Sequence, residues 1–301
     1  MRAYDFLKNI FLALILLQVA PPLIKNIVKN YYNFLEPKSR VAIIPLKGVL
    51  YDASDTIKQL HTYFKDPTIK AIVVKMDCSG SATGTGQSIY DEIMHLKVHN
   101  QKPIITLVEN TCASGGYLIA SATDYIVAPG MSLVGSIGVC LPYLFQMREF
   151  IEKHTITYIP MTAGAYKSTA DPFTDLKPEQ KTLLQSMLND SYEQFITMIA
   201  HNRKLSTSTA KEWADGKIFT GKQALKLGLI DEIGAVSAAV KIIKEKAMIE
   251  GDIEWVKKEK PLSALASLFS GEQPDNDSSL LEGAIHTVCA TLENRYSAAK
   301  L

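Results

Sequence analysis

Ser114 lies in a sequence whose residue types could support nucleophilic chemistry. It belongs to the stretch Cys112-Ala-Ser-Gly-Gly, which follows the apolar run 103–108 and precedes a segment of small residues. A serine on a tight bend between a buried strand and a helix can be presented as a nucleophile, although the two glycines can also serve the bend alone. The nucleophile-elbow pattern G-x-S-x-G is only half matched, because Cys112 replaces the first glycine, so an α/β-hydrolase is disfavoured.

A serine hydroxyl is a weak nucleophile until a base removes its proton. None of the six histidines lies in a strand-end loop with glycine or acidic neighbours. His95 and His99 are four residues apart, which could suit a metal, but the glutamate of HExxH is missing, so we expect packed or solvated histidines. Lys167 lies among small residues in Gly164-Ala-Tyr-Lys-Ser-Thr-Ala and could act as a neutral amine if desolvated. Most lysines are solvated surface charges, so composition alone does not assign this role.

A second glycine turn follows another apolar run, at Met76-Asp-Cys-Ser-Gly-Ser-Ala. Such a turn exposes backbone N–H groups, which can stabilise the oxyanion of a tetrahedral intermediate. An ordinary turn has the same composition.

These segments require elements that position them. Short apolar runs predict five strands, at residues 41–46, 71–76, 103–108, 125–128 and 156–161. Helical patterns lie between or after them, at residues 54–64, 87–97, 115–122 and 141–153. The alternation predicts a mostly parallel sheet covered by helices on both faces. Because ligand sites in such sheets gather at the carboxyl ends of the strands, residues 77–81 and Ser114 are expected at one edge.

The second half of the chain reads as mainly helical. We expect one long amphipathic helix over residues 177–203, three shorter helices up to about residue 248, a polar linker from Gly271 and a terminal helix over residues 280–301.

Composition sets the broad class. The chain has 301 residues, of which 47% are hydrophobic and 21% charged, so it can bury one main core. A net charge of +1 without a long basic run excludes an electrostatic nucleic-acid footprint. The cysteines form no CxxC pair, which argues against a structural zinc site. Small buried thiols are expected, and a single Cys78–Cys112 bridge stays open.

The N-terminus predicts a membrane anchor. Ile10 to Ala20 is apolar and uncharged, and it can reach across a bilayer if residues 6–24 participate. No A-x-A cleavage site precedes Pro21, so an uncleaved anchor is favoured over a signal peptide; an amphipathic or buried helix is the alternative. Lysines and arginines lie on both sides of the segment and do not settle its orientation.

Four blocks in this order and spacing resemble the signal peptide peptidase A family of membrane-anchored serine proteases. They are Asp77-Cys-Ser-Gly-Ser; Ala113-Ser-Gly-Gly-Tyr with Gly135-Ser-Ile-Gly-Val; Tyr166-Lys-Ser-Thr-Ala-Asp-Pro-Phe; and Phe219-Thr-Gly-Lys-Gln-Ala-Leu-Lys-Leu-Gly-Leu-Ile-Asp. The resemblance covers about residues 40–246 and implies a ClpP/crotonase-type α/β fold.

The resemblance also implies the roles of individual residues. Ser114 would be the nucleophile, Lys167 the general base and Ser136 the residue that orients the lysine. Gly80 and the N–H of Gly115 would form the oxyanion hole. The family commonly has Asp/Asn-Ser-Pro-Gly-Gly at the first block, whereas this chain lacks the proline and the second glycine. Gly80 is present, so the donor is assigned there.

The resemblance further implies a single-pass protein of the inner (cytoplasmic) membrane with a periplasmic or extracellular catalytic domain. It implies signal peptides or other membrane-derived peptides as substrates, a homo-oligomeric ring whose protomers complete each other's sites, and no cofactor or metal. The expected organisation is an anchor and connector over residues 1–39, a protease domain over 40–250 and a C-terminal extension over 251–301. The rival functions are a crotonase-type acyl-CoA enzyme and a catalytically silent membrane scaffold.

Overall fold

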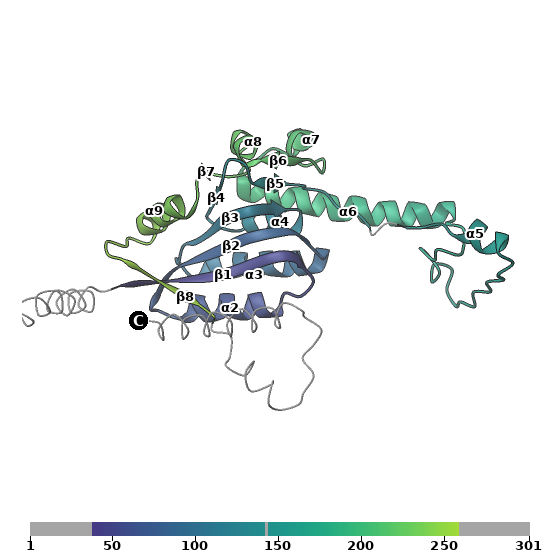
Figure 1. Cartoon of the computed structure of the whole chain (residues 1–301), viewed down its shortest axis with the longest axis horizontal. Coiled ribbons are helices and arrows are strands. Elements are labelled where there is room, and N and C mark those ends of the chain that lie inside the picture. The colour runs from purple at the N-terminus through teal and green to yellow at the C-terminus, as the bar shows by residue number, and fades with distance from the viewer. Residues whose placement is uncertain (1–37, 142–143, 259–301) are drawn as a thin grey trace, which may run out of the picture. The chain divides into compact units, whose positions relative to one another are not determined.

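A mostly parallel sheet forms the centre of residues 38–141 and 144–258, the part of the chain that the computed structural model describes (Figure 1). Its eight strands are β1 Ser39–Leu50, β2 Ile69–Ser81, β3 Ile104–Ala113, β4 Tyr125–Ala128, β5 Leu133–Gly135, β6 Ile218–Thr220, β7 Glu232–Ile233 and β8 Ile253–Lys257. The strand order is β6-β5-β3-β2-β1-β8, and β4 pairs with both β3 and β7. Only β5 and β6 pair antiparallel among these strands. The predicted parallel sheet is therefore confirmed.

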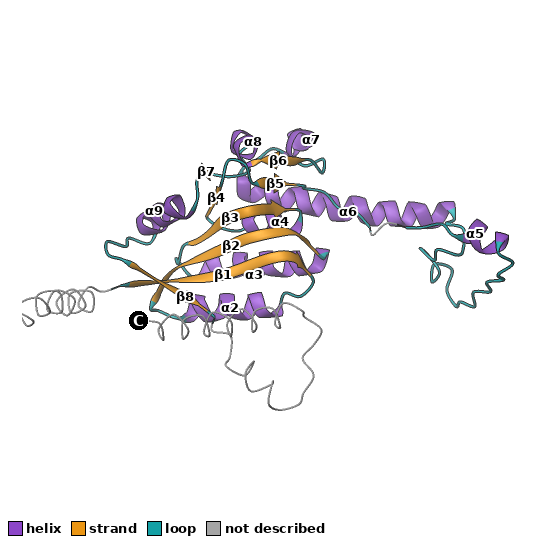
Figure 2. Ribbon diagram, in the orientation of Figure 1, coloured by secondary structure: helices purple, strands orange, loops and turns teal. Residues whose placement is uncertain are grey.

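Helices cover both faces of the sheet (Figure 2). They are α2 Ser54–Lys65, α3 Thr83–His99, α4 Gly115–Ser121, α5 Arg148–Lys153, α6 Pro178–Arg203, α7 Ala210–Trp213, α8 Gly221–Lys226 and α9 Val236–Lys246, with a short 3-10 helix at Thr207–Thr209. The long helix and the three shorter helices that follow it are confirmed. The Pro178–Arg203 helix begins with proline at its first turn, where the missing N–H costs nothing, and ends at Lys204 in the left-handed conformation.

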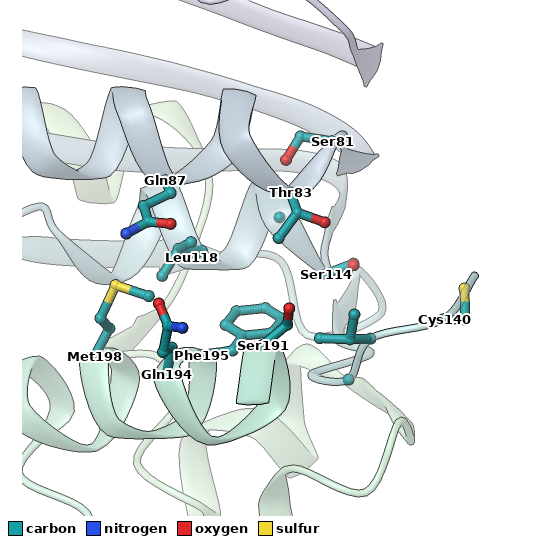
Figure 3. A pocket seen from close by; sticks show the side chains of 13 residues that line it. Ser81, Thr83, Gln87, Ser114, Leu118, Cys140, Ser191, Gln194, Phe195 and Met198 are labelled. Atoms are coloured by element: carbon teal, nitrogen blue, oxygen red, sulfur yellow. The ribbon is translucent and has the colours of Figure 1, made fainter. Parts of the chain in front are cut away.

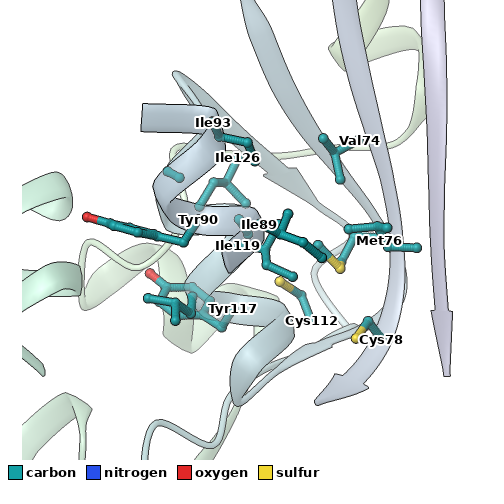
Figure 4. Packing of buried hydrophobic residues seen from close by; sticks show 14 of the residues in the cluster. Val74, Met76, Cys78, Ile89, Tyr90, Ile93, Cys112, Tyr117, Ile119 and Ile126 are labelled. Carbon is teal, nitrogen blue, oxygen red and sulfur yellow. The ribbon is translucent and has the colours of Figure 1, made fainter. Parts of the chain in front are cut away.

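The central strand β2 has a continuous apolar run at residues 71–74, where both faces of the sheet are buried. Ile72 and Val74 of β2 face the larger core, beneath α2, α3, α4 and the C-terminal half of α6, while Val73 between them faces α9. Successive side chains of a strand point to opposite faces, so a continuous apolar run marks a strand that is covered twice. Figure 4 shows the larger core, where Tyr117 of α4 packs among isoleucines of the neighbouring elements.

One predicted strand is wrong. Residues 156–161 form no strand in the structure, and Ile159 and Met161 are largely exposed. Their apolar alternation has no neighbouring strand to pair with. The predicted helix over residues 141–153 is confirmed only in its last part, Arg148–Lys153. The short strands β5 to β8 were not predicted, because segments of two to five residues carry too little periodicity.

The last strand extends the sheet beyond the expected end of the protease domain. β8 pairs in parallel with β1, through partners such as Val41 and Trp255. Residues 253–257 therefore belong to the same sheet as the rest of the fold.

Helix α6 carries a segment away from the sheet. Its C-terminal half packs on α4, whereas its N-terminal end projects outward together with α5 and the connection between them (Figure 1). The N-terminal part of α6, residues 178–190, ends just before Ser191. At about 1.5 Å per residue, this part spans roughly 20 Å. The α5–α6 connection, residues 154–177, lies at this outer end.

The predicted N-terminal anchor and the terminal helix over residues 280–301 lie outside the described residues. Within residues 38–141 and 144–258, no helix has the length and apolar character that crossing a bilayer requires.

Candidate active site

Ser114 occupies a strained bend between β3 and α4. Its backbone has φ 51° and ψ −126°, a conformation that residues with a side chain rarely adopt. The Ser114 N–H donates to the carbonyl of Gly135 at 2.8 Å, and the Ser114 carbonyl accepts from Leu118 N–H at 3.1 Å. These bonds hold the bend from both sides. Strain of this kind persists where the surrounding structure fixes it and is concentrated at functional sites.

Two glycines lie against this serine. A Cβ added to Gly80 would lie 3.5 Å from Ser114 Cβ and 3.7 Å from its Oγ, so Gly80 packs on the serine side chain. Gly115 is the first residue of α4, where a backbone N–H has no partner inside the helix. A Cβ on Gly115 would come within 1.9 Å of Ser81 Oγ, so only glycine fits there as the structure stands.

Irregular pairing brings these residues to one edge. The register of β2 with β3 shifts between Met76 and Cys78, after which Cys78 pairs with Cys112. The extra residues of β3 in this bulge carry Ser114 to the end of β2, as bulges near active sites commonly do.

Ser136 lies beside Ser114 because β3 and β5 run parallel in register. Ala113 pairs with Gly135, so the two serines follow at corresponding positions. Ser136 also has positive φ, 49°, and its N–H donates to the carbonyl of Lys217 at 2.6 Å. The structure thus brings Ser114, Ser136, Gly80 and Gly115 together, and the roles that the resemblance implies for them stay a prediction.

Two cavities meet at Ser114. The first, here called the donor-side cavity, has a volume of about 250 Å³ and extends from Gly115 between α3, α4 and α6 (Figure 3). The second, the base-side cavity, has a volume of about 420 Å³ and contains Ser136, Tyr192 and Asp215. Gly138, Val139 and Cys140 line both cavities.

Sequence reasoning missed several residues of these cavities. Gln87 of α3 and Tyr192 of α6 come from helices whose inward face follows only from the packing. Asp215 lies in a turn before Gly216, and hydrogen bonds from Lys217 lower its pKa. The Ala-Asp-Gly-Lys stretch is a recognisable turn, which was the one available signal.

Ser81 occupies the position where the family commonly has its second glycine. Its Oγ is buried and has no hydrogen-bond partner in the described part of the protein. It lies between Gly86 and Gly115, since a Cβ on either would come within 2.3 Å of it. Buried hydroxyls usually find a partner, so this one is a feature of the site that needs explanation.

Lys167 is not brought to Ser114 within one chain. It is exposed, it lines neither cavity, and it belongs to the connection at the outer end of α6 (Figure 1). No lysine lines the base-side cavity. A single chain therefore presents the candidate nucleophile without the candidate base.

The structure also places the cysteines and the two neighbouring histidines. Cys78, Cys112 and Cys140 are free thiols, so the Cys78–Cys112 bridge is absent, and burial raises the pKa of both Cys78 and Cys112. The rings of His95 and His99 are in contact, with centroids 4.9 Å apart. Among the described residues, no group of histidine, cysteine and carboxylate side chains could hold a metal ion.

A mostly parallel sheet between helical layers fits an α/β fold of the ClpP-like type, and its candidate site is a strained serine beside two glycines. Comparison with known proteins agrees. The model of peptidase family S49 matches residues 97–250, just over half of the chain, so the protein belongs to this family.

Three similar proteins illustrate the relationship. An inferred protease of Methanocaldococcus jannaschii is 35% identical, over 66% of this chain and 63% of its own length. An inferred signal peptide peptidase SppA of Enterococcus faecium is 30% identical, over 65% and 56%. The chloroplastic serine protease SPPA of Arabidopsis thaliana is 30% identical, over 73% and 32%. The chain thus spans less than two thirds of each of these relatives and is related to SppA-type serine proteases.

Proposed function

We propose that the protein is a membrane-anchored serine endopeptidase that cleaves signal peptides or other membrane-derived peptides through an acyl-enzyme, without a cofactor. The observation that carries the proposal is the Ser114 bend, with φ 51° and with Gly80 and Gly115 beside it. A serine held this way would serve acyl transfer, because it lines both cavities and the N–H groups of the adjacent glycines would be available to the developing oxyanion. The alternative of a silent scaffold leaves this strain unexplained.

The reaction proceeds in two steps. Ser114 Oγ forms a bond to the carbonyl carbon of the scissile peptide as its proton moves to a neutral lysine amine. The C–N bond then breaks, and the lysine gives the proton to the departing amine. In the second step, water attacks the carbonyl carbon of the acyl-enzyme while its proton moves to the lysine. The bond to Ser114 Oγ then breaks, the serine recovers its proton from the lysine, and the peptide acid is released. Gly80 and Gly115 N–H groups stabilise the oxyanion in both steps.

The base in this proposal is Lys167 of a neighbouring copy of the chain. The base-side cavity opens at Ser114 and Ser136 and contains Tyr192 and Asp215, but no lysine. Lys167 projects at the far end of α6, together with exposed apolar residues of the same region: Phe145, Phe150, Ile159, Met161 and Met187. An arm of this kind fits the surface of another protomer, and burial there would lower the pKa of the lysine. Ser136 would orient the amine.

The substrate class follows from the proposed location. An N-terminal anchor would keep the site near the bilayer, where apolar peptides are concentrated. The similar protein of Enterococcus faecium is named for signal peptides. An extended peptide can pair with a strand edge near Ser114 while its side chains enter the cavities.

The test compares variants in cleavage of an apolar peptide. Ser114→Ala removes the nucleophile and Lys167→Ala the base, so each should lower kcat by roughly three orders of magnitude or more. Ser88→Ala and Lys153→Ala, at exposed positions of α3 and α5, are the matched controls and should cleave as wild type does. Equal cleavage rates for wild type and both site variants would contradict the Ser-Lys dyad, whereas absence of cleavage by wild type would favour the scaffold.

A further inference from the structure

The two cavities at Ser114 receive different parts of a substrate. In the acyl-enzyme, the carbonyl carbon is bonded to Ser114 Oγ and its oxygen faces Gly80 and Gly115. The residue that supplies this carbonyl has its Cα on the same carbon. Of the two cavities, the donor-side cavity includes Gly115 and the base-side cavity includes Ser136. The departing amine must face the base to receive its proton, so the leaving part of the substrate lies on the base side. The donor-side cavity is then the one left for the side chain of the acyl residue.

The donor-side cavity is lined by apolar side chains and by neutral polar ones, and none of its lining side chains is charged. Leu118, Phe195 and Met198 form apolar walls. The polar lining consists of hydroxyl and carboxamide groups, from Ser81, Thr83, Gln87, Ser191 and Gln194. A charged side chain that entered would lose its hydration without gaining an opposite charge, which is strongly unfavourable. A volume of about 250 Å³ is ample for a long side chain, because one water occupies about 30 Å³.

Gln87 is the side chain best placed to select which substrate side chain binds in the donor-side cavity. It is half-buried on α3 and points into the cavity opposite Met198 and Gln194 (Figure 3). Gln194 donates to Asp190 Oδ2 at 2.8 Å, whereas the Gln87 carboxamide has no hydrogen-bond partner within the described residues. Its donor and acceptor are therefore available to a bound side chain.

We propose that Gln87 is a specificity-determining residue, and that the acyl residue of the substrate has a long, uncharged side chain such as leucine, methionine or glutamine. This inference rests on the proposed peptidase function. The apolar walls contact the aliphatic part of the substrate side chain. The Gln87 carboxamide forms hydrogen bonds with its end if that end is polar, and lies beside it if that end is apolar. Lysine, arginine, aspartate and glutamate are excluded at this position.

The experiment uses four peptides that differ only at the acyl residue, with methionine, glutamine, lysine or glutamate. Wild type should cleave the methionine and glutamine peptides and be at least about tenfold slower in kcat/KM on the other two. Gln87→Glu places a carboxylate in the cavity, so the lysine peptide should gain at least about tenfold relative to the methionine peptide. Gln101→Glu adds the same charge in an exposed loop beyond α3 and should leave the ratios unchanged.

Each outcome has a defined meaning. An unchanged lysine-to-methionine ratio in Gln87→Glu, with cleavage still dependent on Ser114, overturns the inference and leaves the peptidase function intact. A wild type that prefers the lysine or glutamate peptide overturns it as well. Absence of cleavage of every peptide by wild type removes the proposed function and this inference with it. If Gln87→Glu does not fold, Met198→Glu on the opposite wall carries the same expectation.

Discussion

The side chain of Ser81 fills the space that Gly115 leaves because it has no side chain. The Ser81 hydroxyl occupies the space where a side chain at position 115 would lie, and it does so without a hydrogen-bond partner among the described residues. Of the two departures from the family pattern, the missing second glycine is thus a local exchange of a glycine for a serine. Ser81 leaves no room for a side chain at position 115, so the residue after Ser114 has to be glycine as the structure stands.

Gly115→Ala should therefore abolish most activity. The new Cβ would come within 1.9 Å of Ser81 Oγ and 2.9 Å of Ser81 N, so the backbone of the bend must move. Loss of an oxyanion donor lowers kcat by about 100-fold to 1000-fold. The double variant Gly115→Ala, Ser81→Gly removes the Oγ and Cβ contacts and should recover part of the loss. No recovery in peptide-cleavage assays, with circular dichroism showing a folded protein, would contradict this account.

Helix α6 is fixed to the sheet by a partly buried ion pair. The Arg203 guanidinium forms two 2.9 Å bonds to the Asp231 carboxylate, and it also donates to the carbonyl of Gly228. Asp231 in turn accepts from Ile126 N–H, and Tyr117 of α4 donates to the Leu229 carbonyl. The helix that lines both cavities is thereby connected to the helix that follows Ser114.

Arg203→Met should destabilise the protein by about 3 kcal/mol, because it leaves the Asp231 carboxylate partly buried without its partner. The side chains of Arg203 and Asp231 are 9% and 26% exposed. Arg148→Met is the matched control, since Arg148 pairs with Glu152 and Asp175 at 50% exposure. This exposed pair should contribute less than about 1 kcal/mol. Urea unfolding of the variants measures both values, and equal losses would refute the distinction.

The sequence was informative where periodicity was long and where a bend had a specific composition. The doubly covered strands β1 to β4 and the long helix α6 were predicted from their apolar patterns. The bends at Gly80 and Ser114 were predicted from their glycines. The strand at 156–161 was wrong because an exposed apolar segment has the same pattern as a buried one. The cavity residues Gln87, Tyr192 and Asp215 depend on how distant elements pack, which no local pattern contains.

As a whole, the molecule separates the candidate nucleophile from the candidate base. The sheet and its helices carry Ser114, while the outer end of α6 carries the connection with Lys167. Within one chain, the length of α6 keeps them apart. This arrangement predicts that the active unit contains more than one copy.

Mixing two inactive variants tests this prediction. Ser114→Ala retains Lys167, and Lys167→Ala retains Ser114, so an assembly that contains both has some complete sites. Co-refolded or co-expressed variants should recover roughly a quarter of the wild-type rate if protomers assort at random and each site uses one serine and one neighbouring lysine. Each variant alone should stay inactive. Sites completed within one chain would give no recovery in the mixture.

If neighbouring copies complete each other's sites, the outward projection of α6 also makes activity depend on the amount of protein. If every site needs residues from two copies, the rate per molecule rises with concentration until assembly is complete, and the reaction order in enzyme exceeds one at low dose. Chains that are sparse in a membrane would then be latent without any inhibitor or propeptide. Proteolysis would begin only where the copies are dense enough to associate.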